Sequence, residues 1–143
     1  MVKKYCVLMI DDDQLILRAF SRLLNDGDYE LLTVADGEGA LRILKKKPVS
    51  VIVSDEILTT EEGLPVLETL LTNYPHTQRI IFTGWPSETL DWEKIKACKP
   101  FAVVAKPDIE NRLRKAIRAA IKEYEKHTIL SVDGAQNSSG KTM

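Results

Sequence analysis

Acidic residues follow two of the short apolar runs of this chain. Asp11 and Asp12 come directly after YCVLMI, and Asp55 comes directly after VSVIVS. Carboxylates that gather within a few ångströms repel one another, so at neutral pH they take up a proton or recruit a cation. Oxygen ligands suit a hard metal, and Mg²⁺ in particular accepts one or two carboxylates while keeping several waters. The three aspartates are therefore candidate ligands for Mg²⁺ or Mn²⁺.

Two further apolar runs end in residues that could act on an anion beside such a metal. Thr83-Gly84 follows RIIF, and Lys106-Pro107 follows FAVVA. A metal bridging Asp55 and an incoming phosphate would lower charge repulsion, and Lys106 would supply a second positive charge. Thr83 offers a hydroxyl donor to a phosphoryl oxygen, and Gly84 leaves room for the group to enter. Together these residue types favour phosphoryl-transfer chemistry.

Each of these signals also has an ordinary structural interpretation. Asp13 directly precedes a helical pattern, and we interpret it as the N-cap of that helix. An aspartate after a strand, such as Asp55, is a common turn residue, and residues 83–86 or 106–107 alone would also be typical of turns. We favour a shared site because every signal falls at the same end of its own apolar run.

The elements that would position these residues alternate between β-rich runs and helical periodicity. Strands are predicted at residues 5–10, 30–35, 49–54, 79–82 and 101–105. The first, third and fifth runs are almost continuously apolar, which is typical of strands covered by helices on both faces. This alternation predicts an α/β fold, a doubly wound parallel (βα)5 sheet whose strands share one carboxyl edge.

Helices are predicted where apolar residues recur at three- and four-residue spacing. The first pattern comprises Leu15, Ile16, Ala19, Phe20, Leu23 and Leu24; the second Ala40, Leu41 and Leu44; the third Val66, Leu67, Leu70, Leu71 and Tyr74; and the last Ile109, Leu113, Ala116, Ile117, Ala120, Ile121 and Tyr124. Residues 87–99 are the least regular, and we expect one more helix there. Pro48 and Pro75 lie where the second and third helices should end.

The bulk composition predicts one globular domain. The chain has 143 residues, with 44% hydrophobic and 29% charged residues and a net charge of -1, so we expect no direct nucleic-acid binding. We interpret residues 45–47, three lysines directly after a helical pattern, as cations at a helix C-terminus. The N-terminus lacks a long apolar stretch, so we expect no membrane segment and a cytoplasmic location. Residues 127–143 are polar and without periodicity, and we expect disorder or the start of a linker beyond a domain spanning 4–126.

Four stretches of the sequence resemble the marker stretches of response regulator receiver domains, the family of chemotaxis-regulator-like signalling domains. They are VLMIDDD, VIVSDEILTTEEG, IIFTG and VVAKP, in family order. The resemblance implies a flavodoxin-like sheet with strand order 2-1-3-4-5. It also implies a bacterial two-component system in which the domain is phosphorylated and switches a partner-binding surface.

The resemblance implies a role for each metal and acceptor residue. Asp55 matches the phosphoacceptor, Asp12 the direct metal ligand and Asp11 its water-mediated partner. The backbone carbonyl of Ile57 matches the third protein ligand. Ile57 and Trp85 also match the positions that tune dephosphorylation. Because both side chains are bulky and would obstruct an attacking water, we expect slow self-dephosphorylation.

The resemblance further implies a switch. Thr83 matches the switch hydroxyl, and Lys106 matches the lysine that pairs with the acceptor or its phosphoryl group. The bond before Pro107 resembles one that is usually cis in the family. Val103 stands where many receivers have an aromatic side chain that swings inward, and Phe101 is a possible substitute for it.

The loop after the acceptor also departs from the family pattern, with Thr59 in place of a common proline and Glu62-Gly63 in place of Asp-Gly. We expect this loop to be less rigid than usual.

Partners follow from the same resemblance. It implies a sensor histidine kinase or phosphotransfer protein as donor, and a downstream effector or a missing output domain as receiver of the signal. It implies a monomer, or a weak dimer through the helix expected in residues 87–99, the strand at 101–105 and the last helix. It implies no enzymatic activity beyond the domain's own phosphorylation and dephosphorylation.

Two alternatives stay open. Thr59 and Val103 leave room for a degenerate receiver that acts as a phosphorylation-independent interaction module. A haloacid-dehalogenase-like phosphatase would also use a strand-end aspartate, but it requires a second aspartate where Ile57 stands.

Overall fold

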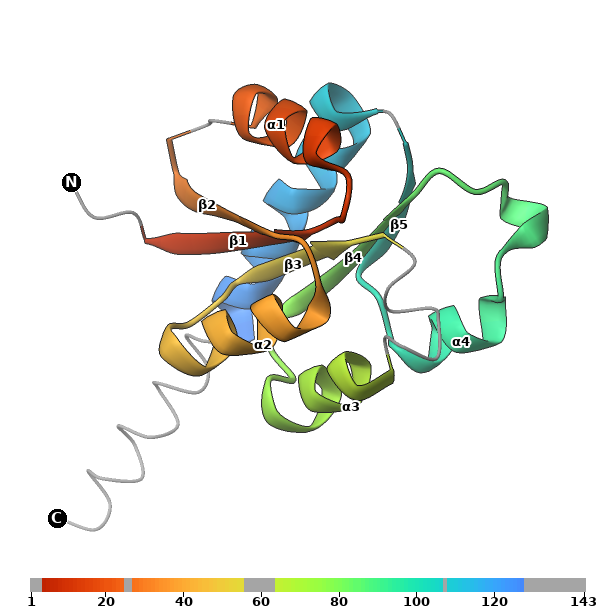
Figure 1. The fold of residues 1–143 in the computed structure, drawn as a ribbon. Coiled ribbons are helices and arrows are strands. Elements are labelled where there is room, and N and C mark those ends of the chain that lie inside the picture. Colours follow the sequence, from red (N-terminus) through yellow and green to blue (C-terminus); the bar gives the residue numbers. More distant parts are fainter. Residues whose placement is uncertain (1–3, 25–26, 56–63, 107, 128–143) are drawn as a thin grey trace, which may run out of the picture.

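Five parallel strands form the centre of the molecule (Figure 1). The computed structural model describes residues 4–24, 27–55, 64–106 and 108–127. The strands are β1 (Tyr5–Ile10), β2 (Tyr29–Val34), β3 (Val51–Ser54), β4 (Gln78–Thr83) and β5 (Ala102–Ala105). Their order is β2-β1-β3-β4-β5, and every neighbouring pair is parallel. The predicted sheet and its strand order are confirmed, with strand ends displaced by at most two residues.

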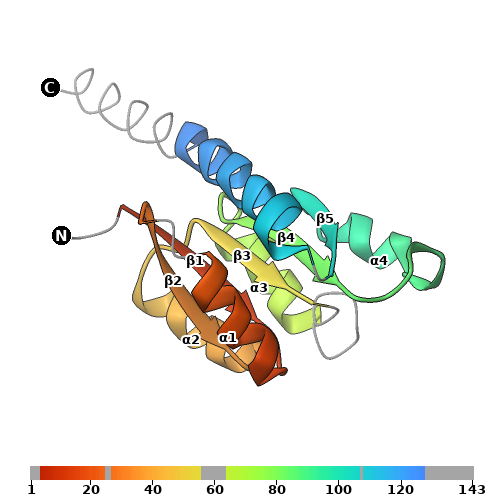
Figure 2. The ribbon, with the colours of Figure 1, turned by 90° about the horizontal axis from the view of Figure 1, so that it is seen from above.

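Helices cover both faces of this sheet. They are α1 (Gln14–Leu23), α2 (Gly37–Lys46), α3 (Leu64–Asn73), α4 (Trp92–Ala97) with a preceding 3-10 turn η3 (Ser87–Thr89), and a C-terminal helix over residues 109–127 that opens as the π-helical segment η4 (Ile109–Leu113). Figure 1 shows α1 on one side of the sheet and α2 and α3 on the other. Seen from above, the strands follow one another from β2 to β5, with α4 beyond β5 (Figure 2). None of the described helices is long and apolar enough to span a membrane.

The core consists of two apolar clusters, one on each face of the sheet. Alternate residues of a strand point to opposite faces, so Val7 and Met9 of β1 belong to one cluster while Leu8 and Ile10 belong to the other. The first cluster is closed by α1 and the C-terminal helix, including Leu17, Phe20, Leu113 and Ile117. The second is closed by α2, α3 and α4, including Ala40, Leu44, Leu70 and Ile95. The sheet is thereby covered on both faces, as the apolar strand runs predict.

The predicted apolar stripe of the first helix is wrong at one position. Leu15 is 73% exposed, whereas Leu17, which lay outside that stripe, is buried together with Phe20 and Leu24. Leu15 lies two residues before Leu17, which is about 200° around an α-helix. It therefore cannot share the buried face that the spacing of Leu17, Phe20 and Leu24 defines.

The fifth strand is less buried than its sequence predicts. Val104 is buried, Ala102 and Val103 are half-buried, and Ala105 is exposed. The reason is topological, because β5 lies at the edge of the sheet and has a strand neighbour on one side only. An apolar run by itself does not distinguish an edge strand from a central one.

Candidate functional site

The three predicted acidic ligands meet at the carboxyl edge of the sheet. The register pairs Ile10 with Ser54, so Asp11 and Asp55 leave adjacent strands side by side. Carboxylate oxygens of Asp11, Asp12 and Asp55 all lie within 4.8 Å of one another. Asp11 and Asp55 are buried, while Asp12 is exposed. The cluster is thus a buried acidic pair with a third carboxylate on its solvent side.

Asp11 is held through both of its carboxylate oxygens. Its Oδ1 accepts a hydrogen bond from the backbone N–H of Asp13 at 2.9 Å, and its Oδ2 accepts one from the Lys106 Nζ at 2.9 Å. The side chain of Asp11 is 1% exposed and that of Lys106 is 19% exposed. Lys106 was predicted to pair with the acceptor or its phosphoryl group, and in this structure it reaches the neighbouring aspartate of the same cluster.

The charges of this cluster fit a divalent cation. One ammonium, that of Lys106, faces three carboxylates, which leaves a net charge of minus two among these described side chains. An all-oxygen donor set with one solvent-facing member suits Mg²⁺ or Mn²⁺, which keep several waters.

Thr83 ends β4 at the same edge and is buried. Its Oγ1 accepts a hydrogen bond from the backbone N–H of Trp85 at 3.1 Å, and its carbonyl accepts one from the backbone N–H of Lys106 at 2.8 Å. The second bond joins the β4 and β5 ends, so the hydroxyl and the ammonium leave neighbouring strands. A Cβ on Gly84 would meet the Lys106 side chain at an ordinary contact distance of 3.7 Å. The role of Gly84 in admitting a phosphoryl group therefore stays a prediction.

The structure describes only some of the remaining predicted positions. Trp85 is 56% exposed on the connection after β4. Ile57 and Pro107 lie outside the described residues, as do Thr59 and the Glu62-Gly63 pair.

The aromatic substitute proposed for Val103 is not supported by its position. Val103 is half-buried against the α2, α3 and α4 cluster. Phe101 precedes β5 and is exposed. It is five residues before Lys106, which corresponds to roughly 16 Å of extended chain. Phe101 therefore lies toward the opposite edge of the sheet from the acidic cluster.

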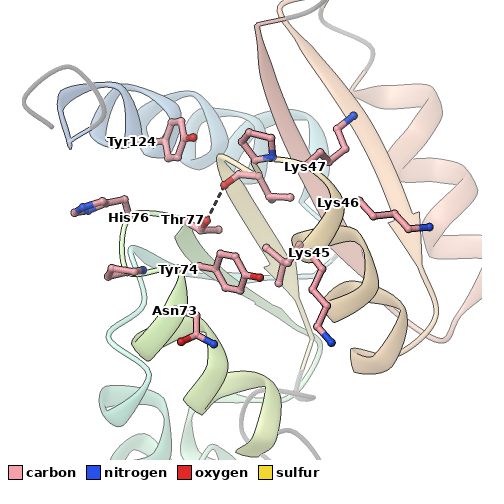
Figure 3. A pocket seen from close by; sticks show the side chains of 12 residues that line it. Lys45, Lys46, Lys47, Asn73, Tyr74, His76, Thr77 and Tyr124 are labelled. Atoms are coloured by element: carbon pink, nitrogen blue, oxygen red, sulfur yellow. Dashed lines mark hydrogen bonds between the residues drawn. The ribbon is translucent and has the colours of Figure 1, made fainter. Parts of the chain in front are cut away.

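One pocket of about 520 Å³ lies at that opposite edge, between the ends of α2 and α3 and beside Tyr124 (Figure 3). Figure 3 shows the side chains of Lys46 and Lys47 pointing away from Tyr74 and His76. Lys47 pairs instead with Glu30. Because α2 ends at Lys46, the interpretation of the lysine run as helix-end cations is confirmed, and the pocket contains none of the predicted site residues.

Sequence reasoning missed the contact between Lys106 and Asp11 and the buried side chain of Arg79, which was counted only as a strand residue. A charged residue inside an otherwise apolar run, as in RIIF, was the available signal for Arg79.

This arrangement has a counterpart in a known protein family. The model of the response regulator receiver domain matches residues 7–118. The chain belongs to this family. As a receiver domain it is a signalling domain of two-component systems, and receiver domains bind Mg²⁺ at an acidic pocket of the kind that Asp11, Asp12 and Asp55 form.

Curated relatives carry the same domain inside longer proteins. The hydrogenase transcriptional regulatory protein HoxA of Cupriavidus necator is 26% identical over 119 residues, which are 83% of this chain and 24% of that protein. The response regulator protein FleR of Pseudomonas aeruginosa is 30% identical over 79 residues, which are 55% of this chain and 17% of that protein. The receiver domain thus spans a quarter or less of the length of these relatives.

Solved structures agree with the fold. The signal receiver domain of an HD domain-containing protein from Pseudomonas fluorescens has a TM-score of 0.78 at 26% identity, covering 90% of this chain and 94% of that one. The chemotaxis response regulator CheY4 of Vibrio cholerae has a TM-score of 0.69 at 27% identity, covering 81% of this chain and 98% of that one. The flavodoxin-like receiver fold is therefore confirmed.

Proposed function

We propose that this receiver domain accepts a phosphoryl group on Asp55 beside Mg²⁺ or Mn²⁺ held by Asp11, Asp12 and Asp55. The observation that carries the proposal is the convergence of the three carboxylates within 4.8 Å beside Lys106. A backbone carbonyl at Ile57, outside the described residues, would complete the protein ligands by family resemblance. When bound, the metal lowers the repulsion between the Asp55 carboxylate and the incoming group.

The transfer itself depends on Asp55 and Lys106. An Asp55 oxygen forms a bond to phosphorus while the bond from phosphorus to the donor breaks. Lys106 supplies an ammonium that can turn from Asp11 toward the phosphoryl oxygens. A cation held by the three aspartates would offset the charge of Asp11 in its place. Burial of Asp11 and Asp55 strengthens these electrostatic interactions relative to water.

Thr83 would couple this chemistry to the surface. A hydroxyl has one proton to donate and lone pairs that accept, so Thr83 can accept from Trp85 N–H and donate to a phosphoryl oxygen. A hydrogen bond to a charged group contributes roughly 1.5–3 kcal/mol, which shifts a two-state equilibrium by about ten- to a hundredfold. The β4–α4 connection, which begins at Thr83, would respond first. The face formed by α4, β5 and the C-terminal helix would then present differently to a partner.

The partners in this proposal are a histidine kinase or phosphotransfer protein as donor and an effector protein or attached output domain as receiver. The short share of HoxA and FleR that the chain covers supports an output domain in a longer protein. The chain itself would be a monomer or a weak dimer through α4, β5 and the C-terminal helix, with its folded unit at residues 4–126.

A degenerate receiver is the competing proposal. The complete set of three aspartates, Thr83 and Lys106 at one edge argues against it. The haloacid-dehalogenase alternative is disfavoured by the family match and by Ile57 in place of a second aspartate.

Intact-mass analysis after incubation with acetyl phosphate and Mg²⁺ tests the proposal. We expect one added phosphoryl group in the wild type and none in Asp55→Asn or after chelation of the metal. Asp36→Asn is the matched control, because Asp36 also follows a strand at this edge but caps α2 and should leave phosphorylation intact. A folded wild type that gains no mass, or an Asp55→Asn protein that still does, would show that Asp55 is not the acceptor.

A further inference from the structure

Arg79 is a buried cation outside the acidic cluster. It is the second residue of β4 and is 7% exposed. Its guanidinium donates to three backbone carbonyls, from Nε to Cys98 at 2.8 Å, from Nη1 to Thr77 at 2.7 Å and from Nη2 to Lys99 at 3.0 Å. No ion pair with Arg79 is present among residues 4–24, 27–55, 64–106 and 108–127. The side chain is therefore satisfied by backbone oxygens alone.

Two of these carbonyls belong to the end of α4. Cys98 is the C-cap of that helix, and Lys99 follows with a φ of +48°, the one positive φ among the described non-glycine residues. The last carbonyls of a helix have no partner within it, and a cation there also complements the helix dipole. Burial lowers the pKa of the Arg79 guanidinium, yet arginine stays charged in proteins. Arg79 thus stabilises a helix end that includes a strained residue.

The backbone of the same residue holds the next part of the turn. The Arg79 carbonyl accepts a hydrogen bond from the Phe101 N–H at 2.6 Å. The pairing of Ile80 with Ala102 begins directly afterwards. Residue 79 therefore contacts the α4–β5 turn, residues 98–101, through both its side chain and its backbone.

The position of Arg79 along β4 relates this turn to the switch. Arg79 and Thr83 are four residues apart, so their side chains leave the same face of the strand at an interval of about 13 Å. That face is the one covered by α3 and α4, since Ile81 between them belongs to that cluster. The connection to α4 begins at Thr83, and the far end of α4 returns to Arg79.

We propose that Arg79 is a positioning residue that fixes the α4–β5 turn to β4. A rearrangement begun at Thr83 is thereby confined to residues 84–91 and the first turn of α4. This confinement rests on the proposed phosphorylation, whereas the anchoring of the turn does not. The face formed by α4, β5 and the C-terminal helix would thus change through its α4 part, where the exposed Trp92 lies, while β5 keeps its place.

Hydrogen exchange of Arg79→Met and wild type, each with and without acetyl phosphate and Mg²⁺, tests the anchoring of the turn and the confinement of the rearrangement separately. In the unphosphorylated variant we expect the amides of Cys98, Lys99 and Phe101 to exchange about tenfold faster or more, the factor that loss of a hydrogen bond to a charged group gives. On phosphorylation we expect exchange changes to stop before residue 95 in the wild type and to extend through residue 101 in Arg79→Met. Arg42→Met, an exposed arginine on α2, is the control and should match the wild type.

A second variant controls for a general loss of stability in Arg79→Met. Lys99→Gly removes the cost of the positive φ, so Arg79→Met with Lys99→Gly should regain global stability while the phosphorylation-dependent changes still spread to residue 101. Unchanged protection of the Cys98, Lys99 and Phe101 amides in both variants would overturn the anchor. If the exchange changes on phosphorylation reach the same residues in the wild type and in the variants, the confinement is wrong. If the wild type accepts no phosphoryl group, the proposed function and the confinement fail together, and the unphosphorylated exchange still decides the anchor.

Discussion

At the scale of single residues, Lys106 and a bound cation would compete for Asp11. The ammonium donates to Asp11 Oδ2 at 2.9 Å in a buried setting, and a metal at the cluster needs the same negative charge. Interactions between unit charges a few ångströms apart near a protein surface are worth several kcal/mol. Removing the Lys106 ammonium and removing a carboxylate of the cluster should therefore change metal affinity in opposite directions.

We expect Asp12→Asn to weaken Mg²⁺ binding about tenfold and Lys106→Met to strengthen it by several-fold, because one removes a negative charge and the other a positive charge from the cluster. Titration calorimetry with MgCl2 measures both. Lys46→Met, at the opposite edge of the sheet, should leave the affinity unchanged. Equal affinities in all four proteins would place the metal elsewhere.

Trp85 is the second residue whose substitution should show at this scale. Its exposed ring follows Thr83 by two residues, and we expect it to obstruct a water that approaches the phosphoryl group in line. Trp85→Glu should shorten the acyl-phosphate lifetime several-fold, as should Ile57→Asn, and decay of the phosphorylated mass with time measures it. Trp92→Glu alters the other exposed tryptophan, on α4, and should keep the wild-type lifetime. If Trp85→Glu has the same lifetime as Trp92→Glu, Trp85 does not obstruct the attacking water.

At the scale of elements, the aspartates that begin helices must be separated from those of the cluster. Within the described part of the chain, four helices have aspartate N-caps whose side chains accept from backbone N–H groups, namely Asp13, Asp36, Asp91 and Asp108. Capping satisfies helix N–H groups that have no partner within the helix. These four aspartates therefore stabilise helix starts, and Asp11, Asp12 and Asp55 remain as the candidate ligands among the aspartates that the structure describes at this edge.

The approach of α2 to α3 gives a stability prediction for these elements. A Cβ on Gly37 would lie 2.4 Å from the Val66 Cγ2, closer than atoms can pack, and Val66 is buried and stiff at χ1. Gly37→Ala gains up to about 1 kcal/mol of helix preference but overpacks the contact at a cost of about 1–3 kcal/mol. We expect net destabilisation in urea unfolding.

A double-mutant cycle identifies the cause of that destabilisation. Val66→Ala removes the clashing methyl group, so the alanine at position 37 should cost less in the Val66→Ala background than in the wild type. Equal costs in both backgrounds would show that the loss does not arise from this contact.

At the scale of the whole molecule, the cluster closed by α2, α3 and α4 encloses two titratable thiols, those of Cys6 and Cys98. Burial raises the pKa of Cys6 to about 11 and also raises the pKa of Cys98. A raised pKa contributes stability that is fully present below the unfolded value of 9.0 and is lost as pH rises toward 11. For a shift of two pKa units, the free energy of unfolding falls by at most about 2–3 kcal/mol.

We therefore expect the free energy of unfolding to fall between pH 9 and pH 11, and Cys6→Ala to reduce that fall even though it lowers stability at pH 7. Urea unfolding of both proteins across this pH range measures the fall in stability of each. The difference between the two falls reports on Cys6, because the other titrating groups are present in both proteins. Parallel curves for wild type and Cys6→Ala would show that the thiol does not titrate differently on folding.

The sequence alone determined the order of strands and helices, the edge at which Asp11, Asp55, Thr83 and Lys106 end their strands, and the capping role of Asp13. These follow from spacing along a short stretch of chain, because the periods of helix and strand are local properties. The burial of Leu17 in place of Leu15 and the exposure of β5 were decided by which elements lie beside them.

Only the tertiary structure decided which distant groups pair. Lys106 and Asp11 are 95 residues apart, and Arg79 reaches carbonyls 19 and 20 residues away. No local period encodes such contacts. They arise when buried charges and helix-end carbonyls, removed from water by packing on both faces of the sheet, must find partners within the fold.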